Sequence, residues 1–321
     1  MCAQRLFAEK MDTSLAIWLT NQQHEPPIIA YVHSVFEKVI NFISVDQKRL
    51  FSIGNAAVMM SPQMIKVREV SNFLWFDESI NPSKPIYLID NRLVIVDTLE
   101  LYFEKAERWN GSIYRFSPFP FSRLILLKII QEITLVIEQE GKDGGFRTVW
   151  LSFMKKKNLP MTHTHEREIA KRFERLCSLT DEENWEAVYG AAKQFGGLGL
   201  GLTPSGDDFL TGWLLTLMAF DHPIITIFME KKEEWLRFLK DRTTDISYFM
   251  LEAVMNGQGN EAVIELLQRH TEKEAIIKKL LRKVLSLGST SGTDMLAGIG
   301  FALEVMLTTR RRELNDIQGH Y

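Results

Sequence analysis

The sequence predicts an α+β protein in which an N-terminal β-rich domain, barrel or sandwich-like, precedes a C-terminal helical bundle domain. The chain has 321 residues, of which 45% are hydrophobic, enough for two buried cores. Short β-branched and aromatic runs separated by turn residues fill the first third. Helical spacing of apolar residues dominates afterwards. The proline-containing stretch SPFPFS (117–122) reads as a linker, so we expect domains over 1–120 and 121–321.

Five segments before residue 100 have the composition of β-strands. They are 28–36, 38–44, 49–55, 64–70 and 86–96. The last holds Asp90 and Asn91 between two apolar runs, a pattern typical of a hairpin. Turn signals such as Pro26-Pro27 and Asn81-Pro82 recur at short spacing. Short strands with such turns favour a small antiparallel barrel or sandwich.

Later segments repeat apolar residues at helical spacing and predict a bundle. They are 124–140, 166–179, 181–195, 208–220, 231–241, 247–256, 260–270, 273–287 and 294–310. The most apolar long segment, 124–140, is interrupted by Lys128, Gln131 and Glu132. These polar positions predict a packed helix and argue against a membrane span.

Composition narrows the function classes. The net charge is −3 and neither half of the chain is basic, which argues against nucleic acid as a partner. The two cysteines, Cys2 and Cys177, predict free thiols in a reducing compartment. The N-terminus lacks the three-part layout of a secretory signal. We therefore expect a cytoplasmic protein without membrane contact.

One motif occurs twice. TPSGDDFLTGWLLTL (203–217) aligns without gaps with STSGTDMLAGIGFAL (289–303), at an offset of 86 residues. In both copies a glycine-bearing loop leads into an apolar helix. The identical pairs are Ser205/Ser291, Gly206/Gly292, Asp208/Asp294, Leu210/Leu296, Gly212/Gly298 and Leu217/Leu303. A degenerate duplication and convergence on one kind of helix start both explain the likeness.

The structural interpretation of these motifs is a capping box, Ser-x-x-Asp before an apolar run. Ser205 and Ser291 would cap their own helices, and Asp208 and Asp294 would reach back to the capping residues. Capping alone, however, needs neither the preceding string GGLGLGLTP nor the additional carboxylate of Asp207. The sequence therefore also supports a binding function.

The functional interpretation is an anion site, because a glycine loop that opens a helix leaves backbone amides free at the positive end of the helix dipole. Asp207 and Asp208 would repel a phosphate unless a cation such as Mg²⁺ bridges them, or unless they bind the amide end of a ligand. If the two loops meet, Asp207, Asp208, Thr293 and Asp294 would surround one pocket.

Three other stretches carry weaker signals. DRTTDIS (241–247) offers Arg242, which could bind a carboxylate or phosphate bidentately, or simply be exposed before a helix. NGQGNE (256–261) predicts a tight turn. HTHE (163–166) has only two histidines, which is a poor metal signature, and helix capping by Thr164 explains it as well. No Ser-His-Asp or Cys-His arrangement can be argued from the sequence.

Taken together, GLTPSGDDFLTG, RTTDIS and GSTSGTDMLAG resemble the AllH-like family, a bacterial family linked to the small third subunit of oxamate carbamoyltransferase. The motif-level likeness spans 150–310. The resemblance implies a role in anaerobic allantoin breakdown, a branch of purine catabolism. There oxalurate and phosphate are converted to oxamate and carbamoyl phosphate by a complex of three different subunits.

We therefore expect a subunit of a carbamoyl- or acyl-transferring complex that binds a small anion such as phosphate, carbamoyl phosphate or an oxalurate-like molecule. Asp207 and Asp208 are the candidate catalytic residues and the candidate Mg²⁺ ligands. The candidate substrate-binding residues are Gly201, Thr203, Ser205, Gly206, Arg242, Thr243, Ser247, Ser289, Ser291, Gly292, Thr293 and Asp294. A non-catalytic assembly or regulatory subunit and a stand-alone Mg²⁺-dependent hydrolase are the alternatives.

Overall fold

The computed structural model describes residues 3–22, 28–76, 80–95, 98–116, 122–269 and 272–318. Its contacts divide the chain into two compact units, Met1–Gly111 and Ser112–Tyr321. The first unit is mainly strand and the second is helical, so the predicted α+β fold class is confirmed. Cys2, the Pro26-Pro27 turn and most of the expected linker at 117–122 lie outside the described residues.

The first unit holds nine strands within its described residues. They are β1 (Gln4–Asp12), β2 (Ile28–Val35), β3 (Val39–Ser44), β4 (Leu50–Gly54), β5 (Met64–Val67), β6 (Pro85–Ile89), β7 (Arg92–Ile95), β8 (Leu99–Tyr102) and β9 (Glu107–Trp109). A helix, α1 (Thr13–Asn21), follows β1, and a 3₁₀ turn, η1 (Phe73–Phe76), follows β5. The Asp12 carboxylate caps α1 by accepting a 3.0 Å hydrogen bond from the Leu15 amide.

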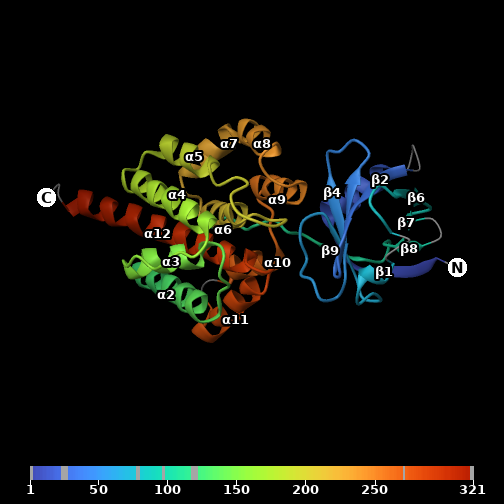
Figure 1. Cartoon of the computed structure of the whole chain (residues 1–321), viewed down its shortest axis with the longest axis horizontal. Helices are drawn as coiled ribbons and strands as arrows, with labels where there is room; N and C mark the ends of the chain where they lie inside the picture. The colour runs from blue at the N-terminus through green and yellow to red at the C-terminus, as the bar shows by residue number, and fades with distance from the viewer. Residues whose placement is uncertain are drawn as a thin grey trace. The chain divides into compact units, whose positions relative to one another are not determined.

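Eight of these strands close into a barrel (Figure 1). The order is β5-β4-β3-β2-β6-β7-β8-β1, and β1 pairs back onto β5. The first half of β1 runs parallel to β8 and its second half pairs antiparallel with β5, so this one strand closes the ring. Of the two β architectures that the sequence allowed, the barrel is the one observed.

Apolar side chains fill the barrel and fix its register. Leu6 and Met11 of β1 are completely buried, and Phe42 stacks on Phe51 across β3 and β4 with ring centroids 5.1 Å apart. The predicted hairpin turn is present between β6 and β7. Asp90 and Asn91 there have φ of 47° and 58°, the positive values that a tight two-residue hairpin turn requires.

The second unit is helical throughout its described residues. Its helices are α2 (Arg123–Glu140), α3 (Phe146–Lys155), α4 (Thr164–Asp181), α5 (Trp185–Lys193), α6 (Ser205–Ala219), α7 (Ile224–Glu230), α8 (Lys232–Lys240), α9 (Asp245–Met255), α10 (Glu261–Gln268), α11 (Glu274–Leu285) and α12 (Ser291–Gln318). Each predicted helix overlaps one of these. Helices α1, α3 and α7 and strands β1, β8 and β9 were not predicted.

Helix α6 is the centre of this unit, and Figure 1 shows it surrounded by the other helices. Every residue of α6 is buried, which explains why its sequence is apolar on all sides. Phe209 of α6 stacks on Phe146 of α3 with centroids 4.3 Å apart and planes within 5°. This contact fixes the start of α3 beside the start of α6.

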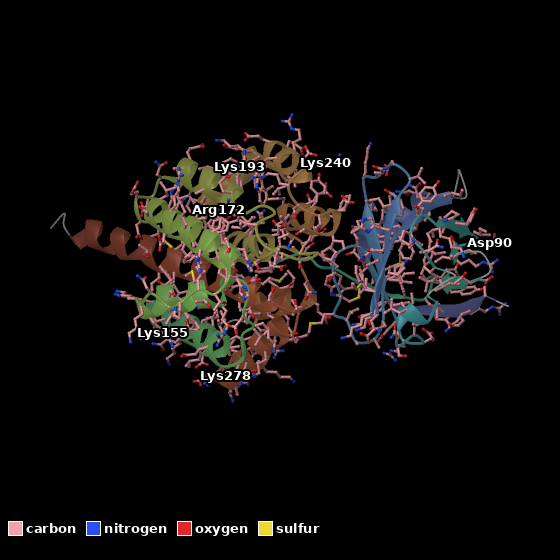
Figure 2. The ribbon with its side chains drawn as sticks, viewed as in Figure 1. Asp90, Lys155, Arg172, Lys193, Lys240 and Lys278 are labelled. Carbon is pink, nitrogen blue, oxygen red and sulfur yellow. The ribbon has the colours of Figure 1, made fainter. Side chains whose placement is uncertain are left out.

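Charged side chains lie at the outside of the helical unit, among them Lys155, Arg172, Lys193 and Lys278 (Figure 2). Each of these four pairs with a carboxylate, as in the 3.1 Å bridge from Arg172 to Glu168. Exposed pairs of this kind contribute little to stability, typically about 0–1 kcal/mol each. The stability of the unit therefore rests mainly on its buried apolar contacts.

Within the described residues, no single helix is both long and apolar enough to cross a bilayer. The pair α6 and α7 meets the criteria of length and composition only when joined across a bend of 112°. Because α6 is wholly buried inside the helical unit, its apolar character is that of a core helix.

Candidate functional site

The two look-alike segments meet in the fold, because α6 and α12 cross at their shared glycines. A Cβ added to Gly212 would lie 2.1 Å from the carbonyl oxygen of Met295. A Cβ added to Gly298 would lie 2.1 Å from the carbonyl oxygen of Phe209. Phe209 and Met295 differ by the same offset as the glycines, so each helix makes the same contact to the other. The crossing is therefore an approximate twofold arrangement of the repeated motif.

The helix starts also touch. The Thr203 and Ser291 hydroxyl oxygens are 2.9 Å apart. The capping-box interpretation is wrong for Ser205, because Pro204 precedes the first turn of α6 and no side chain caps that helix. Instead, the hydroxyl of Ser291 faces Asp208 and the hydroxyl of Ser205 faces Asp294. Each serine hydroxyl thus interacts with the aspartate of the other copy of the motif.

Asp207 is buried and accepts three hydrogen bonds. The Gly197 amide donates to Oδ1 at 2.9 Å, the Ser247 hydroxyl donates to Oδ2 at 2.7 Å, and the Thr243 hydroxyl also donates to Oδ2. Burial raises the pKa of Asp207, and these three hydrogen bonds oppose the rise. The carboxylate therefore ties the start of α6 to the glycine loop and to the start of α9.

Close backbone contact explains one of the glycines. Gly197 has φ of 73°, and a Cβ there would lie 1.9 Å from the carbonyl oxygen of Arg242. Only glycine permits this approach. The contact brings the predicted 242–247 stretch against the glycine loop, and Thr244 strengthens it by donating a 2.5 Å hydrogen bond to the Leu202 carbonyl.

Asp208 and Asp294 are completely buried near one another, on opposite helices. Burial, followed by the charge of Asp294, raises the pKa of Asp208 well above its usual value, and the hydroxyls of Ser291 and Thr203 oppose this. Burial raises the pKa of Asp294 to about 7, against hydrogen bonds that favour its ionised form. At neutral pH these two carboxyls together carry less than their full charge unless a cation joins them.

Their hydrogen bonding is incomplete. Asp294 Oδ1 accepts a 2.6 Å hydrogen bond from the amide of Phe146, the first residue of α3. Asp294 Oδ2 and both oxygens of Asp208 are buried and have no hydrogen bond of normal geometry within the described chain. Buried carboxylate oxygens without a partner are uncommon and costly.

Six of the eight first-turn amides of the two helices are already bonded; those of Ser205 and Ser291 donate no hydrogen bond within the described residues. The Gly206 amide donates to Leu198 O at 2.7 Å, and the Gly292 amide donates to Leu287 O at 3.0 Å. The amides of Asp207 and Asp208 donate to Pro204, and those of Thr293 and Asp294 donate to Thr290. The expectation that the first-turn amides are free for a ligand is therefore wrong for these six. Apart from the amides of Ser205 and Ser291, an anion would have to bind to the loops in front of the helices.

The glycine loop before α6 is exposed. Gly199 and Gly201 have φ of 125° and 92°, and a Cβ on Gly201 would meet nothing within 4 Å. Leu200 is 74% exposed and Leu202 is 49% exposed. The amides of 199–202 donate no hydrogen bond within the described residues. This loop therefore offers unpaired donors and an apolar edge to a ligand or a partner.

Two further predicted residues are also accessible. Ser289 is exposed in the corresponding loop before α12. Arg242 is exposed, with its guanidinium 4.5 Å from the ring centroid of Phe238. Thr293 is buried instead, and its hydroxyl accepts a 3.0 Å hydrogen bond from the Lys142 amide.

Two models of known families match this chain. One, described as oxamate carbamoyltransferase subunit AllH, matches residues 195–303. The other, described as the AllH family N-terminal domain, matches residues 8–108. Together they cover most of the sequence and fall in the two units in turn. The chain belongs to the AllH family. No solved structure matches it.

The AllH match contains both look-alike segments and the 242–247 stretch, but it excludes the start of α3. Sequence reasoning also missed Gly145 and Phe146. A Cβ on Gly145 would lie 2.3 Å from Asp294 Oδ1, so this glycine lets the first amide of α3 reach the carboxylate. The string KDGGF (142–146) was the available signal, because glycines ahead of an apolar helix indicate close backbone approach.

The histidines of HTHE do not join this cluster. Thr164 begins α4, and Glu166 accepts a 3.1 Å hydrogen bond from the His163 amide, so the stretch is a helix start. His165 Nε2 lies 2.8 Å from Gly144 O. No group of three or more histidine, cysteine or acidic residues is placed to hold a metal among the described residues.

Cys177 lines a separate cavity of about 320 Å³ between α3 and α4, with Phe153, Lys156, Met161 and Glu174 among the other lining residues. Burial raises the pKa of the Cys177 thiol far above its usual value. The thiol is therefore protonated and not poised as a nucleophile.

Proposed function

We propose that this chain is a subunit of a carbamoyl-transferring complex of the oxamate carbamoyltransferase type, and that its glycine loop binds a small anionic substrate. The observation that carries the proposal is the junction of both look-alike segments and the 242–247 stretch around one exposed loop. The description of the matching family supports the transferase part. The loop geometry supports the anion part.

The proposed anion site consists of the free amides of 199–202, the hydroxyl of Ser289 and the guanidinium of Arg242. Alternating positive-φ glycines form the kind of backbone whose amides can converge on an anion. A guanidinium near such amides binds a carboxylate or phosphate bidentately. Phosphate, carbamoyl phosphate and oxalurate all present these groups.

Asp207 then acts as a positioning residue. Its carboxylate fixes Gly197 and Thr243, and so holds the two sides of the proposed anion site against each other. Transfer of a carbamoyl group to phosphate depends mainly on positioning and charge stabilisation. A side chain that only fixes two loops can therefore still affect the rate strongly.

Binding by the purified chain tests the anion site. We expect phosphate, carbamoyl phosphate, oxamate or oxalurate to raise the melting temperature, and Arg242→Ala to weaken the binding. Loss of a charged hydrogen bond of about 1.5–3 kcal/mol corresponds to a roughly tenfold to hundredfold rise in Kd. Arg237→Ala removes another exposed arginine, on α8, and serves as the control. If wild-type protein binds none of the four anions, alone or with its partner subunits, the site is wrong.

A non-catalytic assembly subunit is the second candidate, favoured by the exposed Leu200 and Leu202. Apolar side chains held out on a loop suit burial against another subunit. In this case the double variant Leu200→Ala/Leu202→Ala would lose co-purification with partner subunits, whereas Leu124→Ala, exposed on α2, would keep it. Unchanged co-purification of the double variant would count against docking through this loop.

The third alternative, a stand-alone hydrolase using Asp207, Asp208 and Asp294 around one Mg²⁺, has less support. Asp207 is enclosed by donors from Gly197, Thr243 and Ser247, whereas the other two carboxyls lie between α6 and α12. A single ion would have to compete with three hydrogen bonds to reach Asp207.

A further inference from the structure

The carboxyls of Asp208 and Asp294 pose a problem of charge that is independent of the proposed anion site. Both are completely buried. Among the described residues, no lysine, arginine or histidine is among the groups that act on either carboxyl. Two buried carboxylates without a basic partner are strongly unfavourable, so something else must compensate them.

The hydrogen bonds of the two carboxyls are also incomplete. Both oxygens of Asp208 and one oxygen of Asp294 accept none of normal geometry, although all three are buried. The hydroxyls of Thr203 and Ser291 interact with Asp208, and these two are 2.9 Å from each other. Three carboxylate oxygens therefore remain available to bind a ligand.

The surroundings of the pair are rich in oxygen. Thr203 and Ser291 face Asp208, and Ser205 and Thr290 face Asp294. Each set takes residues from both copies of the repeated motif, so the oxygens are arranged about the crossing of α6 and α12. Hydroxyl and carboxylate oxygens are the ligands that hard cations prefer.

We propose that a hard divalent cation binds between Asp208 and Asp294, with hydroxyl oxygens from Thr203, Ser205, Thr290 and Ser291 as the further ligands. A divalent ion balances the charge of two carboxylates, whereas a monovalent ion would balance only one. The burial of the site leaves little space for bound water, and Ca²⁺ and Mn²⁺ tolerate this better than Mg²⁺ does. The cation would join the starts of the two helices.

Metal content and thermal stability of the full chain test the proposal. The protein is stripped with a chelator and titrated separately with Ca²⁺, Mn²⁺ and Mg²⁺, with the metal retained after gel filtration measured by elemental analysis. We expect one equivalent to be retained and the melting temperature to rise until that equivalent is bound. Asp208→Asn and Asp294→Asn should both abolish the rise.

Asp207→Asn is the matched control, because Asp207 lies next to Asp208 and is equally buried but makes its own hydrogen bonds. This variant should be less stable yet keep its response to the metal. If the Asp208 and Asp294 variants fail to fold, the metal retained by wild-type protein decides the matter. The proposal is overturned if wild-type protein retains none of the three metals. It is also overturned if Asp208→Asn and Asp294→Asn retain the metal and keep the same rise in melting temperature as wild-type protein.

Discussion

At the scale of single residues, buried groups without partners are the most informative features of this chain. His222 lies between α6 and α7 and is 6% exposed, with its ring edge-to-face on Trp185 at 5.2 Å. Its Nδ1 accepts a 3.3 Å hydrogen bond from the Ile224 amide, and its Nε2 has no partner within the described residues. Only the neutral ring fits this environment.

His222 therefore predicts acid sensitivity. Burial lowers its pKa to about 4 in the folded state. The unfolded chain binds this proton below pH about 6.5, so stability is full above that pH and is lost as the pH falls towards 4. The loss is on the order of 2–3 kcal/mol. Urea unfolding at several pH values checks it, with His222→Phe as the comparison. Equal pH slopes for both proteins would contradict the prediction.

Single residues also show what the sequence could predict. The Asp90-Asn91 turn was predictable because its backbone conformation depends on those two residues alone. The role of Ser205 was not, because its hydroxyl faces Asp294, a residue of the other copy. A capping motif shows which side chains a segment contains. It does not show whether those side chains form hydrogen bonds with their own helix or with a residue far away in the sequence.

At the scale of elements, the crossing of α6 and α12 controls the positions of both helix starts. Gly212 and Gly298 each face a backbone carbonyl, which cannot move aside as a side chain can. Gly212→Ala and Gly298→Ala should therefore force the helices apart and destabilise the protein by about 1–3 kcal/mol each. Urea unfolding of the full chain measures this.

Gly190 provides the control for the same substitution. It lies within α5, and a Cβ there would meet nothing within 4 Å. Gly190→Ala should stabilise the protein by roughly 0.5–1 kcal/mol, because alanine is the better helix former. The change in unfolding free energy should have opposite signs at Gly190 and Gly212. This difference separates the effect of close packing from that of helix propensity. A neutral effect at both crossing glycines would show that the helices tolerate separation.

The strands and helices that were not predicted depend on contacts with residues far away in the sequence. Strand β1 carries charged residues in both halves, and it is fixed by pairing with β5, β8 and β9. Helix α3 has no side-chain cap of its own, since Asp294 accepts the hydrogen bond from its first amide. Helices α2 and α11 were predictable because their apolar spacing is local. The repeated motif predicted which helix starts belong together, but not how they exchange partners.

At the scale of the whole molecule, the two units each have their own core. Residues 112–116, at the start of the second unit, form hydrogen bonds with the helical unit. Ser112 forms a β-bridge with Gln258, and the Ile113 amide donates a 2.8 Å hydrogen bond to Gly257 O. The Phe116 amide donates to Ala219 O at 2.7 Å. The segment 112–116 thus fastens the end of α6 to the turn before α10.

These bonds predict how the chain can be divided. A fragment of residues 112–321 keeps the segment 112–116, whereas a fragment that starts at residue 121, where the proline-rich stretch suggested a boundary, loses it. We expect both fragments to be helical by circular dichroism. The shorter one should be less stable by about 1–3 kcal/mol, since it leaves the carbonyls of Gly257 and Ala219 without these donors. Thermal unfolding of the two fragments compares them directly, and equal melting temperatures would show that 112–116 is only a connection. A lower melting temperature for the shorter fragment would assign the segment to the same folding unit as α6, and so to the helix on which the candidate site is built.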